Sequence, residues 1–578
     1  MHDLVIRNGT VVDGSGAPPV EADVAIDGDR IAAVGRVPGR GREEIDARGQ
    51  LVAPGFVDIH THYDGQATWD AEMAPSAWHG VTTVVMGNCG VGFAPARPDR
   101  HDWLIGLMEG VEDIPGTALA EGMTWDWESF PQYLDALGKL PRTVDVATHV
   151  PHGAVRAYVM GERGARNEAP TAAEIAHMAA LVEDGLRAGA LGFSTSRTVL
   201  HRSVDRELVP GTSATREELI GIGAALGRVG HGVFEMVSDF RRAWNEFAWM
   251  GELSRAHRVP VTFAALQSIA KEMPLAEQIA CMEAENARGA RLVAQIALRG
   301  TGVVMAWRGT VHPFRFKPAW LEIADLPWPE KLAALRTPAL RERLLAEPPV
   351  YPVPDMAHIH RVIAEGWSTQ FPLGADFDYE PAAHASIAAQ AAARGIAPAA
   401  LAYDLLMADD GTGFLYLPIL NYADGNLDFL DALQRRDDTV NSLSDGGAHC
   451  GTICDAASPT FMLQHWVRDR RRGRIPLALA IRRQCRDTAL LYGLADRGLL
   501  APGLLADLNV IDFDRLRLSR PWLAFDLPAG GKRLLQKADG YTATIKSGRI
   551  TFRDGALQAP RPGGVIRGPR AAAGAAAR

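Results

Sequence analysis

The chain has few cysteines, no long apolar run and no excess of positive charge. Its 578 residues include only 5 cysteines, an odd number too small for a disulfide scaffold, which favours a reducing compartment. No stretch approaches the roughly 20 consecutive apolar residues that a membrane-spanning helix needs. The opening segment, MHDLVIRNGT, lacks the apolar core of a secretory signal. We therefore expect a cytoplasmic protein with no membrane partner.

The charge balance and the composition restrict the class of protein further. Lysine and arginine number 60 and aspartate and glutamate 69, so the formal net charge is −9, which argues against a nucleic-acid groove. The apolar share of 47% and the charged share of 22% are ordinary for a folded enzyme and exclude wholesale disorder. We expect a small molecule as the partner, with no nucleic acid, and the sequence allows a homo-oligomer.

Both ends of the chain carry strand patterns. The segments LVIRNGTVVDG and ADVAIDGDRIAAVG place β-branched residues around Asn-Gly and Asp-Gly turns. A similar pattern returns near the other end in ADLNVIDFDRLRL and YTATIKSGRITFRDG. We expect residues 1–54 and 501–560 to form one small β-sandwich domain, and two independent β caps are the alternative.

The long middle of the chain alternates short apolar runs with helical stretches. The runs are LVAPGFVDIH, VTTVVMG, TVDVATHV, ALGFSTS, GVFEMVS, VPVTFAAL, ARLVAQIAL and VNSLSDGG. Eight strands alternating with helices predict an α/β fold, a (β/α)₈ TIM-like barrel over residues 55–500. Insertions are expected near 94–141 and 306–439, the second being either a lid over the substrate or a packing appendage. The Ala/Gly/Arg-rich tail, 561–578, is expected to be disordered.

The segment GFVDIHTHYDG places two histidines directly after an apolar run. In a strand, residues i and i+2 point to the same side, so His60 and His62 could reach one metal ion together. Two imidazoles at this spacing are half of a site for a borderline ion such as zinc. The chemistry of a barrel lies at the carboxyl ends of its strands, which favours this interpretation over two surface histidines.

Two further residues follow apolar runs in glycine-rich loops. Cys89 lies in VTTVVMGNCGVGFAP and could bind a metal as a thiolate, or be a buried structural cysteine. Asp445 lies in VNSLSDGGAHCG and could bind a metal or carry a proton from the attacking water to a leaving nitrogen. Together with the two histidines, they describe a mononuclear or binuclear hydrolytic metal site.

At this point the sequence resembles the amidohydrolase superfamily, and in particular its D-aminoacylase (N-acyl-D-amino-acid deacylase) branch. The matching segments include PGFVDIHTHYDGQATWD, SAWHGVTTVVMGNCGVGFAP, SDGGAHCG and RGLLAPGLLADLNVID. The resemblance runs from residue 1 to about residue 555. It implies a (β/α)₈ barrel with a β domain made from both termini, and zinc-dependent hydrolysis of the amide of an N-acyl-D-amino acid.

The resemblance also implies roles for individual residues. His60 and His62 match the first-strand ligands, Cys89 matches the cysteine ligand, and Asp445 matches the last-strand carboxylate that handles the proton. We therefore expect one or two divalent metal ions, with zinc favoured by the nitrogen ligands, whereas a richer oxygen set would admit manganese or iron.

This chain departs from the pattern of the resembled branch at two strands. That branch has further histidine ligands on the fifth and sixth strands, where this chain has Glu235 and Gln267. Glu235 either replaces one histidine as an oxygen ligand or is a substrate-binding or salt-bridged carboxylate. Gln267 is a poor zinc ligand and is expected to contact the substrate.

Three more residues near expected strand ends are candidates for substrate binding. His152 follows DVATHVP, Arg197 follows GFSTS and could clamp a substrate carboxylate, and His449 lies near Asp445. For each of these three residues, a structural role is the alternative to substrate binding. The sequence thus predicts a metal-dependent amidohydrolase, with a related amide, a cyclic imide or a D-residue peptide as alternative substrates. A catalytically silent barrel that only binds a ligand is the alternative from another class.

Overall fold

Eight parallel strands form the central sheet. The computed structural model describes residues 1–268, 272–351 and 357–571. The strands, in chain order and with neighbours paired, are β6 (Phe56–Asp58), β7 (Val81–Met86), β8 (Asp145–Pro151), β9 (Gly192–Arg197), β10 (Val233–Ser238), β11 (Val261–Ala264), β12 (Leu292–Ile296) and β16 (Thr439–Asn441). Each lies in one of the eight predicted apolar runs. This confirms the predicted fold class.

Hydrogen bonds between the first and last strands close the sheet into a barrel. Thr61 forms a parallel bridge with Gly446, and the His62 N–H donates to the Gly446 carbonyl at 2.8 Å. The strands are largely buried because both of their faces are covered, as the fully buried β7 shows. The carboxyl ends of all eight strands therefore meet at one mouth.

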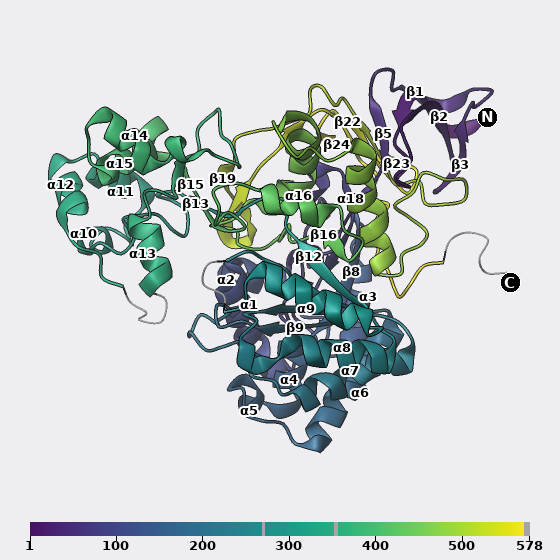
Figure 1. Ribbon diagram of the computed structural model, residues 1–578, viewed down its shortest axis with the longest axis horizontal. Helices are drawn as coiled ribbons and strands as arrows, with labels where there is room; N and C mark the ends of the chain where they lie inside the picture. The colour runs from purple at the N-terminus through teal and green to yellow at the C-terminus, as the bar shows by residue number, and fades with distance from the viewer. Residues whose placement is uncertain (269–271, 352–356, 572–578) are drawn as a thin grey trace.

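Helices connect the strands on the outside of the barrel (Figure 1). They are α4 (His152–Met160), α6 (Ala172–Ala188), α7 (Arg216–Val229), α8 (Glu246–His257), α9 (Leu275–Ala287), α16 (Asp428–Gln434) and α18 (Leu477–Leu491). Helix α6 begins at a capping box in which Thr171 and Glu174 satisfy each other's backbone N–H groups, and it ends at Gly189. Among the described residues, no helix has the combined length and apolar character needed to cross a membrane.

Two excursions from the barrel occupy the regions where insertions were predicted. Between β7 and β8 lie α1 (His101–Glu112), α2 (Gly116–Gly122) and α3 (Phe130–Gly138). Between β12 and β16 lies a lobe with strands β13 (Thr301–Met305), β14 (Phe371–Pro372) and β15 (Leu415–Leu420). Its helices are α10 (Pro318–Leu321), α11 (Trp328–Leu335), α12 (Pro338–Ala346), α13 (Ala357–Glu365), α14 (Ile387–Arg394) and α15 (Pro398–Gly411).

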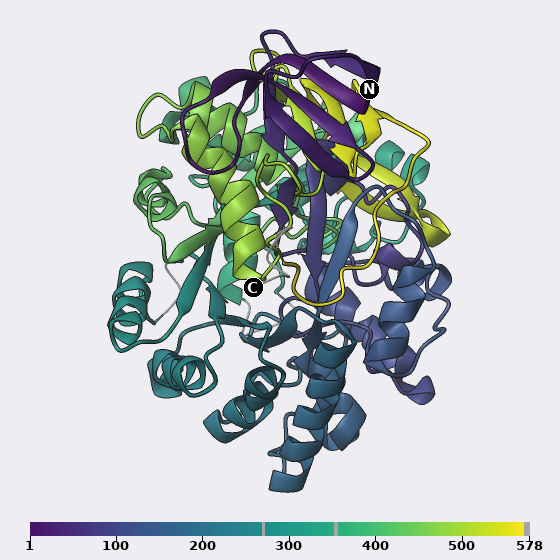
Figure 2. The ribbon, with the colours of Figure 1, turned by 90° about the vertical axis from the view of Figure 1, so that its right-hand side faces the viewer.

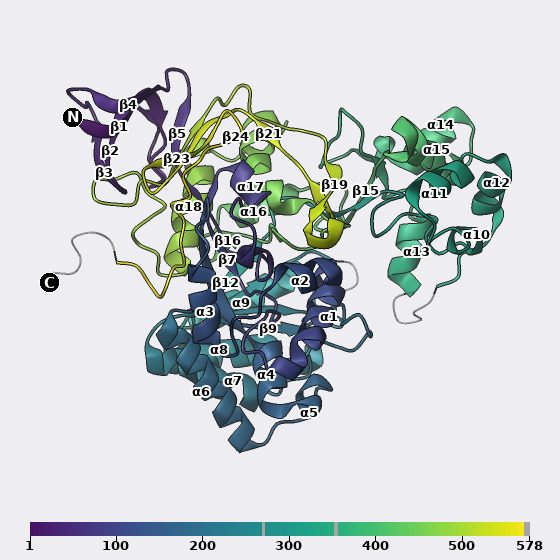
Figure 3. The same cartoon turned by 180° about the vertical axis from the view of Figure 1, so that it is seen from behind.

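This lobe has its own hydrophobic core, which includes Trp307, Phe314, Leu344 and Leu406. It stands apart from the barrel in Figures 1 and 3. The hairpin of β19 (Trp522–Leu527) and β20 (Gly531–Leu535) lies beside the base of the lobe. The lobe is thus an independently packed unit attached near the barrel mouth.

Strands from both ends of the chain share one mixed sheet, as predicted. The first end contributes β1 (His2–Val11), β2 (Val20–Asp27), β3 (Arg30–Gly35), β4 (Gly41–Asp46) and β5 (Leu51–Pro54). The other end contributes β17 (Leu508–Ile511), β22 (Tyr541–Lys546), β23 (Arg549–Arg553) and β24 (Ala556–Leu557). The halves join where β5 pairs antiparallel with β17, and Figure 2 shows the purple and yellow strands together.

The C-terminal segment differs from our prediction of disorder over 561–578. Residues 561–571 follow the lower end of the barrel, where the Ile566 N–H donates to the Val146 carbonyl and Gly563 pairs with Arg142. Ile566 is buried in a cluster with Val57, Val85 and other residues of the barrel floor. The buried Ile566 side chain and the paired backbone groups hold this segment in place, although its composition is of low complexity. Residues 572–578 lie outside the described part of the chain.

A buried ion network connects the β domain to the barrel. The Lys546 ammonium on β22 lies 2.9 Å from Asp145 on β8 and 3.0 Å from Asp507. Arg497 reaches the same Asp145 carboxylate at 2.7 Å. Although burial opposes it, these two cations lower the pKa of Asp145 to about 2. The Asp145 carboxylate is therefore ionised.

We expect Lys546→Met to destabilise the protein by about 3–5 kcal/mol, because it leaves the buried Asp507 carboxylate without its cation and removes one of the two cations at Asp145. Lys139→Met is the matched control, since Lys139 forms an exposed pair with Asp126 and its loss should cost under about 1 kcal/mol. Urea unfolding of both variants measures the difference. Equal unfolding midpoints would show that the Lys546 network contributes nothing to stability.

Candidate metal centre

His60 and His62 follow β6 and are both buried, with 1% of each residue exposed. His60 Nδ1 lies 2.9 Å from the amide oxygen of Gln295 on β12, which also accepts a hydrogen bond from Ser442. Because an amide oxygen only accepts, this contact places the His60 proton on Nδ1 and leaves the Nε2 lone pair free. This tautomer suits a metal-binding imidazole.

The Nε2 atoms of both histidines face Asp445 and Cys89. Asp445 Oδ1 lies 3.5 Å from His60 Nε2 and 3.7 Å from His62 Nε2, and Cys89 Sγ lies 3.4 Å from His60 Nε2. Ligand atoms of His60, His62 and Cys89 all lie within 4.8 Å of one another. The structure thus groups three of the five predicted ligands, His60, His62 and Cys89, and places Asp445 beside the two histidines.

These separations fit a zinc-sized ion. Tetrahedral bonds of about 2.0–2.3 Å place neighbouring ligand atoms roughly 3.3–3.6 Å apart, close to the observed distances. Two imidazole nitrogens, a sulfur and a carboxylate oxygen are a donor set that zinc accepts. The residues present therefore fit the expected metal.

The loops that carry Cys89 and Asp445 adopt left-handed backbone conformations. Cys89 has φ of 56° and Asp445 has φ of 49°, which are uncommon for residues other than glycine. The neighbouring glycines leave no room for a side chain: a Cβ on Gly447 would lie 2.7 Å from a Tyr63 ring carbon. A Cβ on Gly90 would lie 2.9 Å from the backbone of Ser196. Tight glycine turns thus aim both side chains at the cluster.

Glu112, at the end of α1, makes the surroundings of the histidines acidic. Its Oε1 lies 3.4 Å from His62 Nδ1, and its Oε2 lies 3.5 Å from His449 Nε2. Burial opposes protonation of His62, but Glu112 and Asp445 raise its pKa to about 9. The negative potential that raises this pKa also attracts a metal cation.

Cys89 requires such a cation to become a thiolate. Burial, followed by the charges of Glu235 and Glu112, raises the pKa of its thiol well above the usual range. A bound metal ion would supply the positive charge that lowers this pKa. Metal binding and deprotonation of Cys89 are therefore coupled.

Glu235 lies at the cluster, on β10, and is fully buried. One carboxylate oxygen accepts the Cys89 N–H at 3.0 Å, while the other lies 3.9 Å from His60 Nδ1 and has no hydrogen-bond partner. Burial raises the pKa of Glu235 to about 8. The carboxyl holds the cysteine loop in place, and coordination by its second oxygen stays a prediction.

Two residues predicted to bind substrate have structural partners instead. Both ring nitrogens of His152 are occupied, by Thr195 at 2.8 Å and Glu218 at 3.1 Å. Arg197 pairs with Glu246 at 2.8 Å and donates to the Ala214 carbonyl. Neither side chain joins the metal cluster, and the expected carboxylate clamp at Arg197 stays a prediction.

Gln267 also lies away from the cluster. Its amide nitrogen donates to Asp424 at 2.7 Å, and its amide oxygen accepts from the Ala423 N–H at 3.1 Å. These bonds fasten the end of β11 to the loop that returns from the lobe. Gln267 thus has a structural role, and its predicted contact with substrate stays a prediction.

His449 is brought to the site as predicted, on the solvent side of Glu112, with 24% of its side chain exposed. Two nearby residues were missed by the sequence analysis. Glu112 lies in an insertion without any motif. His201, hydrogen-bonded to Ser196 at 3.0 Å, has its pKa lowered to about 3 by burial and by the neighbouring His449 and His62. The only sequence signal for His201 was the polar composition of the segment HRSVDRE, which begins with it.

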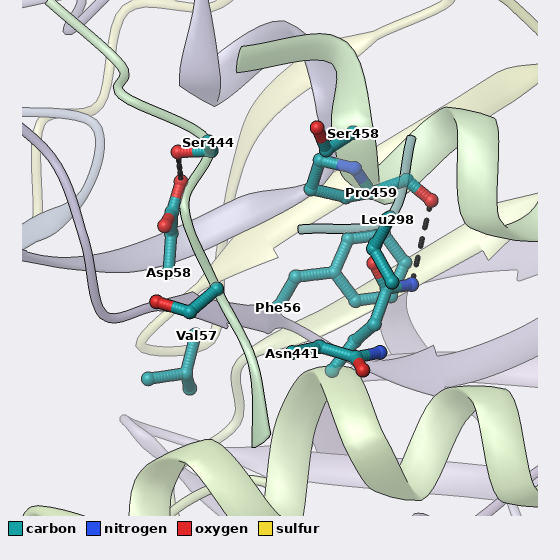
Figure 4. A pocket seen from close by; sticks show the side chains of 10 residues that line it. Phe56, Val57, Asp58, Leu298, Asn441, Ser444, Ser458 and Pro459 are labelled. Carbon is teal, nitrogen blue, oxygen red and sulfur yellow. Dashed lines mark hydrogen bonds between the residues drawn. The ribbon is translucent and has the colours of Figure 1, made fainter. Parts of the chain in front are cut away.

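A small cavity lies behind the strand ends. It has a volume of about 30 Å³ and is lined by residues that include Phe56, Asp58, Asn441 and Ser444. Figure 4 shows the Ser444 hydroxyl bonded to the Asp58 carboxylate at one side of it. Burial raises the pKa of Asp58 to about 7. A space of this size holds about one water molecule, so a substrate must approach from the open mouth.

Comparison with known proteins gives concordant results. A model of the amidohydrolase family matches residues 43–552. D-aminoacylase of Alcaligenes xylosoxydans xylosoxydans is 38% identical over 221 residues, which are 38% of this chain and 41% of that protein. The chain thus aligns with about two fifths of the length of this relative.

Two solved structures share the fold over nearly the whole chain. A D-aminoacylase structure, described for its binuclear metal centre, has a TM-score of 0.65 at 24% identity and covers 98% of this chain and 100% of its own. The N-acyl-D-glutamate deacylase of Bordetella bronchiseptica, complexed with zinc and a phosphonate inhibitor, has a TM-score of 0.64 at 22% identity, with coverage of 98% and 99%. With the family match over 43–552, these findings establish that the chain belongs to the amidohydrolase family.

Proposed function

We propose that this protein is a metal-dependent hydrolase that cleaves the amide bond of an N-acyl-D-amino acid. The observation that carries the proposal is the Asp445 carboxylate, which lies 3.5 and 3.7 Å from two histidine Nε2 atoms at the mouth of a barrel. The aligned D-aminoacylase and the N-acyl-D-glutamate deacylase of the same fold support this choice of substrate.

We assign His60, His62, Asp445 and Cys89 as the metal ligands. When bound, zinc would polarise the scissile carbonyl and lower the pKa of water toward about 7. At the fifth and sixth strands this chain has Glu235 and Gln267, whereas the D-aminoacylase branch has histidines there. The Gln267 amide already donates a hydrogen bond to Asp424. The proposal therefore favours a single ion over two.

Asp445 is the proposed proton carrier. Burial alone would raise its pKa, but His62, His60 and His449 hold the pKa of this carboxyl well below its usual range. It is therefore ionised at neutral pH and can accept a proton from the attacking water. With 17% of its side chain exposed, it can pass that proton to the departing nitrogen.

Glu112 and His449 complete the proposed site. Glu112 lies between His62 and His449, with one carboxylate oxygen within ion-pair distance of each ring. His449 is the remaining candidate for a substrate contact, since His152, Arg197 and Gln267 have other partners.

Removal of the metal should abolish hydrolysis, and added zinc should restore it. The test is to chelate and reconstitute the enzyme with zinc, manganese or iron. Each form is then assayed on N-acyl-D-amino acids, their L-enantiomers, cyclic imides and D-residue dipeptides. We expect N-acyl-D-amino acids to give the highest kcat/KM. If only a cyclic imide is turned over, the substrate is a cyclic imide and not an N-acyl-D-amino acid. A metal content below about 0.3 ion per chain, without activation by added metal, would favour a catalytically silent barrel that only binds a ligand.

Asp445→Asn should lower kcat by roughly 10²- to 10⁴-fold, because the amide cannot accept the proton. Asp437→Asn is the matched control, since that side chain is 93% exposed and lies away from the mouth. Circular dichroism checks the fold of each variant. Unchanged kcat in a folded, metal-loaded Asp445→Asn enzyme would remove Asp445 from the mechanism.

Cys89→Ala should weaken zinc binding roughly tenfold or more, as expected for loss of a group at the metal. Cys454→Ala is the control, because Cys454 is equally buried but lies beside Arg299. Competition with a chromophoric chelator gives both affinities. Equal zinc affinities in the two variants would show that Cys89 is a structural cysteine.

A further inference from the structure

A second, larger cavity lies between the lobe and the β19–β20 hairpin. Its volume is about 630 Å³, within the range of small-molecule sites. Its walls combine aromatic and cationic side chains, and none of the described residues that line it is acidic. The residues that carry the argument are Trp307, Arg308, His312, Arg315, Phe525 and Lys532.

The cations of this cavity lack acidic partners. Among the described residues, no carboxylate lies within ion-pair distance of Arg308, Arg315 or Lys532. By contrast, two arginines of a 430 Å³ cavity at the lower end of the barrel have an acidic partner, since Arg482 and Arg483 reach Asp487 at 3.0 and 3.2 Å. Burial lowers the pKa of Arg308, Arg315 and Lys532, and at Arg315 and Lys532 the charge of Asp113, which lies outside ion-pair distance of both, offsets this shift only in part. Positive charge thus accumulates in a confined space.

Apolar and aromatic surface accompanies this charge. The Arg308 guanidinium lies 4.1 Å from the ring centre of Phe525 and 5.2 Å from that of Trp328. Phe525, Leu321 and Val350 line the cavity yet are 43%, 59% and 60% exposed. Large apolar side chains left in water beside a cavity are typical of a binding site.

Two buried polar groups in the wall are also without partners. Trp307 Nε1 and His312 Nδ1 make no hydrogen bond, although each residue is only 2% exposed. Buried polar groups are nearly always hydrogen-bonded, and each exception calls for an explanation. A bound ligand with acceptor atoms would explain both unpaired groups.

We propose that this cavity is a binding site for a carboxylate that carries an aromatic or bulky apolar group. Arg308, Arg315 and Lys532 bind the carboxylate, and the exposed aromatic and aliphatic side chains cover the apolar group. The site is distinct from the metal cluster, to which none of its lining residues contributes a ligand. This inference does not depend on the proposed hydrolytic activity.

Benzoate is the probe for this site, with benzamide as its neutral counterpart and acetate as an anion without a ring. Binding is followed by calorimetry and by tryptophan fluorescence, because Trp307, Trp320 and Trp328 line the cavity. We expect benzoate to bind about tenfold or more tightly than either of the others. Binding should also weaken with added salt.

Arg308→Gln and Lys532→Gln should each weaken benzoate binding about tenfold or more. Arg394→Gln, on α14 of the same lobe, is the control and should leave binding unchanged. Chelated enzyme and the Asp445→Asn variant should bind benzoate like the wild type, which separates this site from the metal centre. Wild-type affinity in both cavity variants, or loss of binding on chelation, would overturn the proposal whether or not the enzyme hydrolyses amides.

Discussion

The hydrogen bonds between the first and last barrel strands hold the metal site together. Asp445 N–H donates to the His60 carbonyl at 3.2 Å, and His62 N–H donates to Gly446 at 2.8 Å. These bonds place a carboxylate beside two histidines that are nearly 400 residues away in the chain. The site therefore depends on closure of the whole barrel, since neither strand alone carries a complete set of donors.

The features predicted from sequence are those that local physical rules determine. Parallel strands buried on both faces appear as apolar runs, and their carboxyl ends must converge, so the barrel and His60, His62 and Asp445 could be predicted. The roles of His152 and Arg197 could not, because their partners Glu218 and Glu246 come from other elements of the fold. Glu112 lies at the end of an ordinary helix, and only the folded chain shows that it faces the histidines.

Two regions of opposite potential are built into this chain. Carboxylates surround the metal cluster and raise the pKa of His62, whereas unpaired cations line the cavity beneath the lobe. They meet at Asp113, which accepts hydrogen bonds from Thr310 of the cavity wall and from the Gly451 N–H, next to Glu112. The contact between the lobe and the barrel mouth at Asp113 is thus polar. Cations lie on its lobe side and carboxylates on its barrel side.

The course of residues 561–571 sets a limit on how the C-terminus can be altered. Because Ile566 closes the floor of the barrel and its neighbours pair with β8, this segment belongs to the folded body. Purification tags are best fused beyond residue 571. The packed body of the described residues thus extends past β24, the last strand of the β domain.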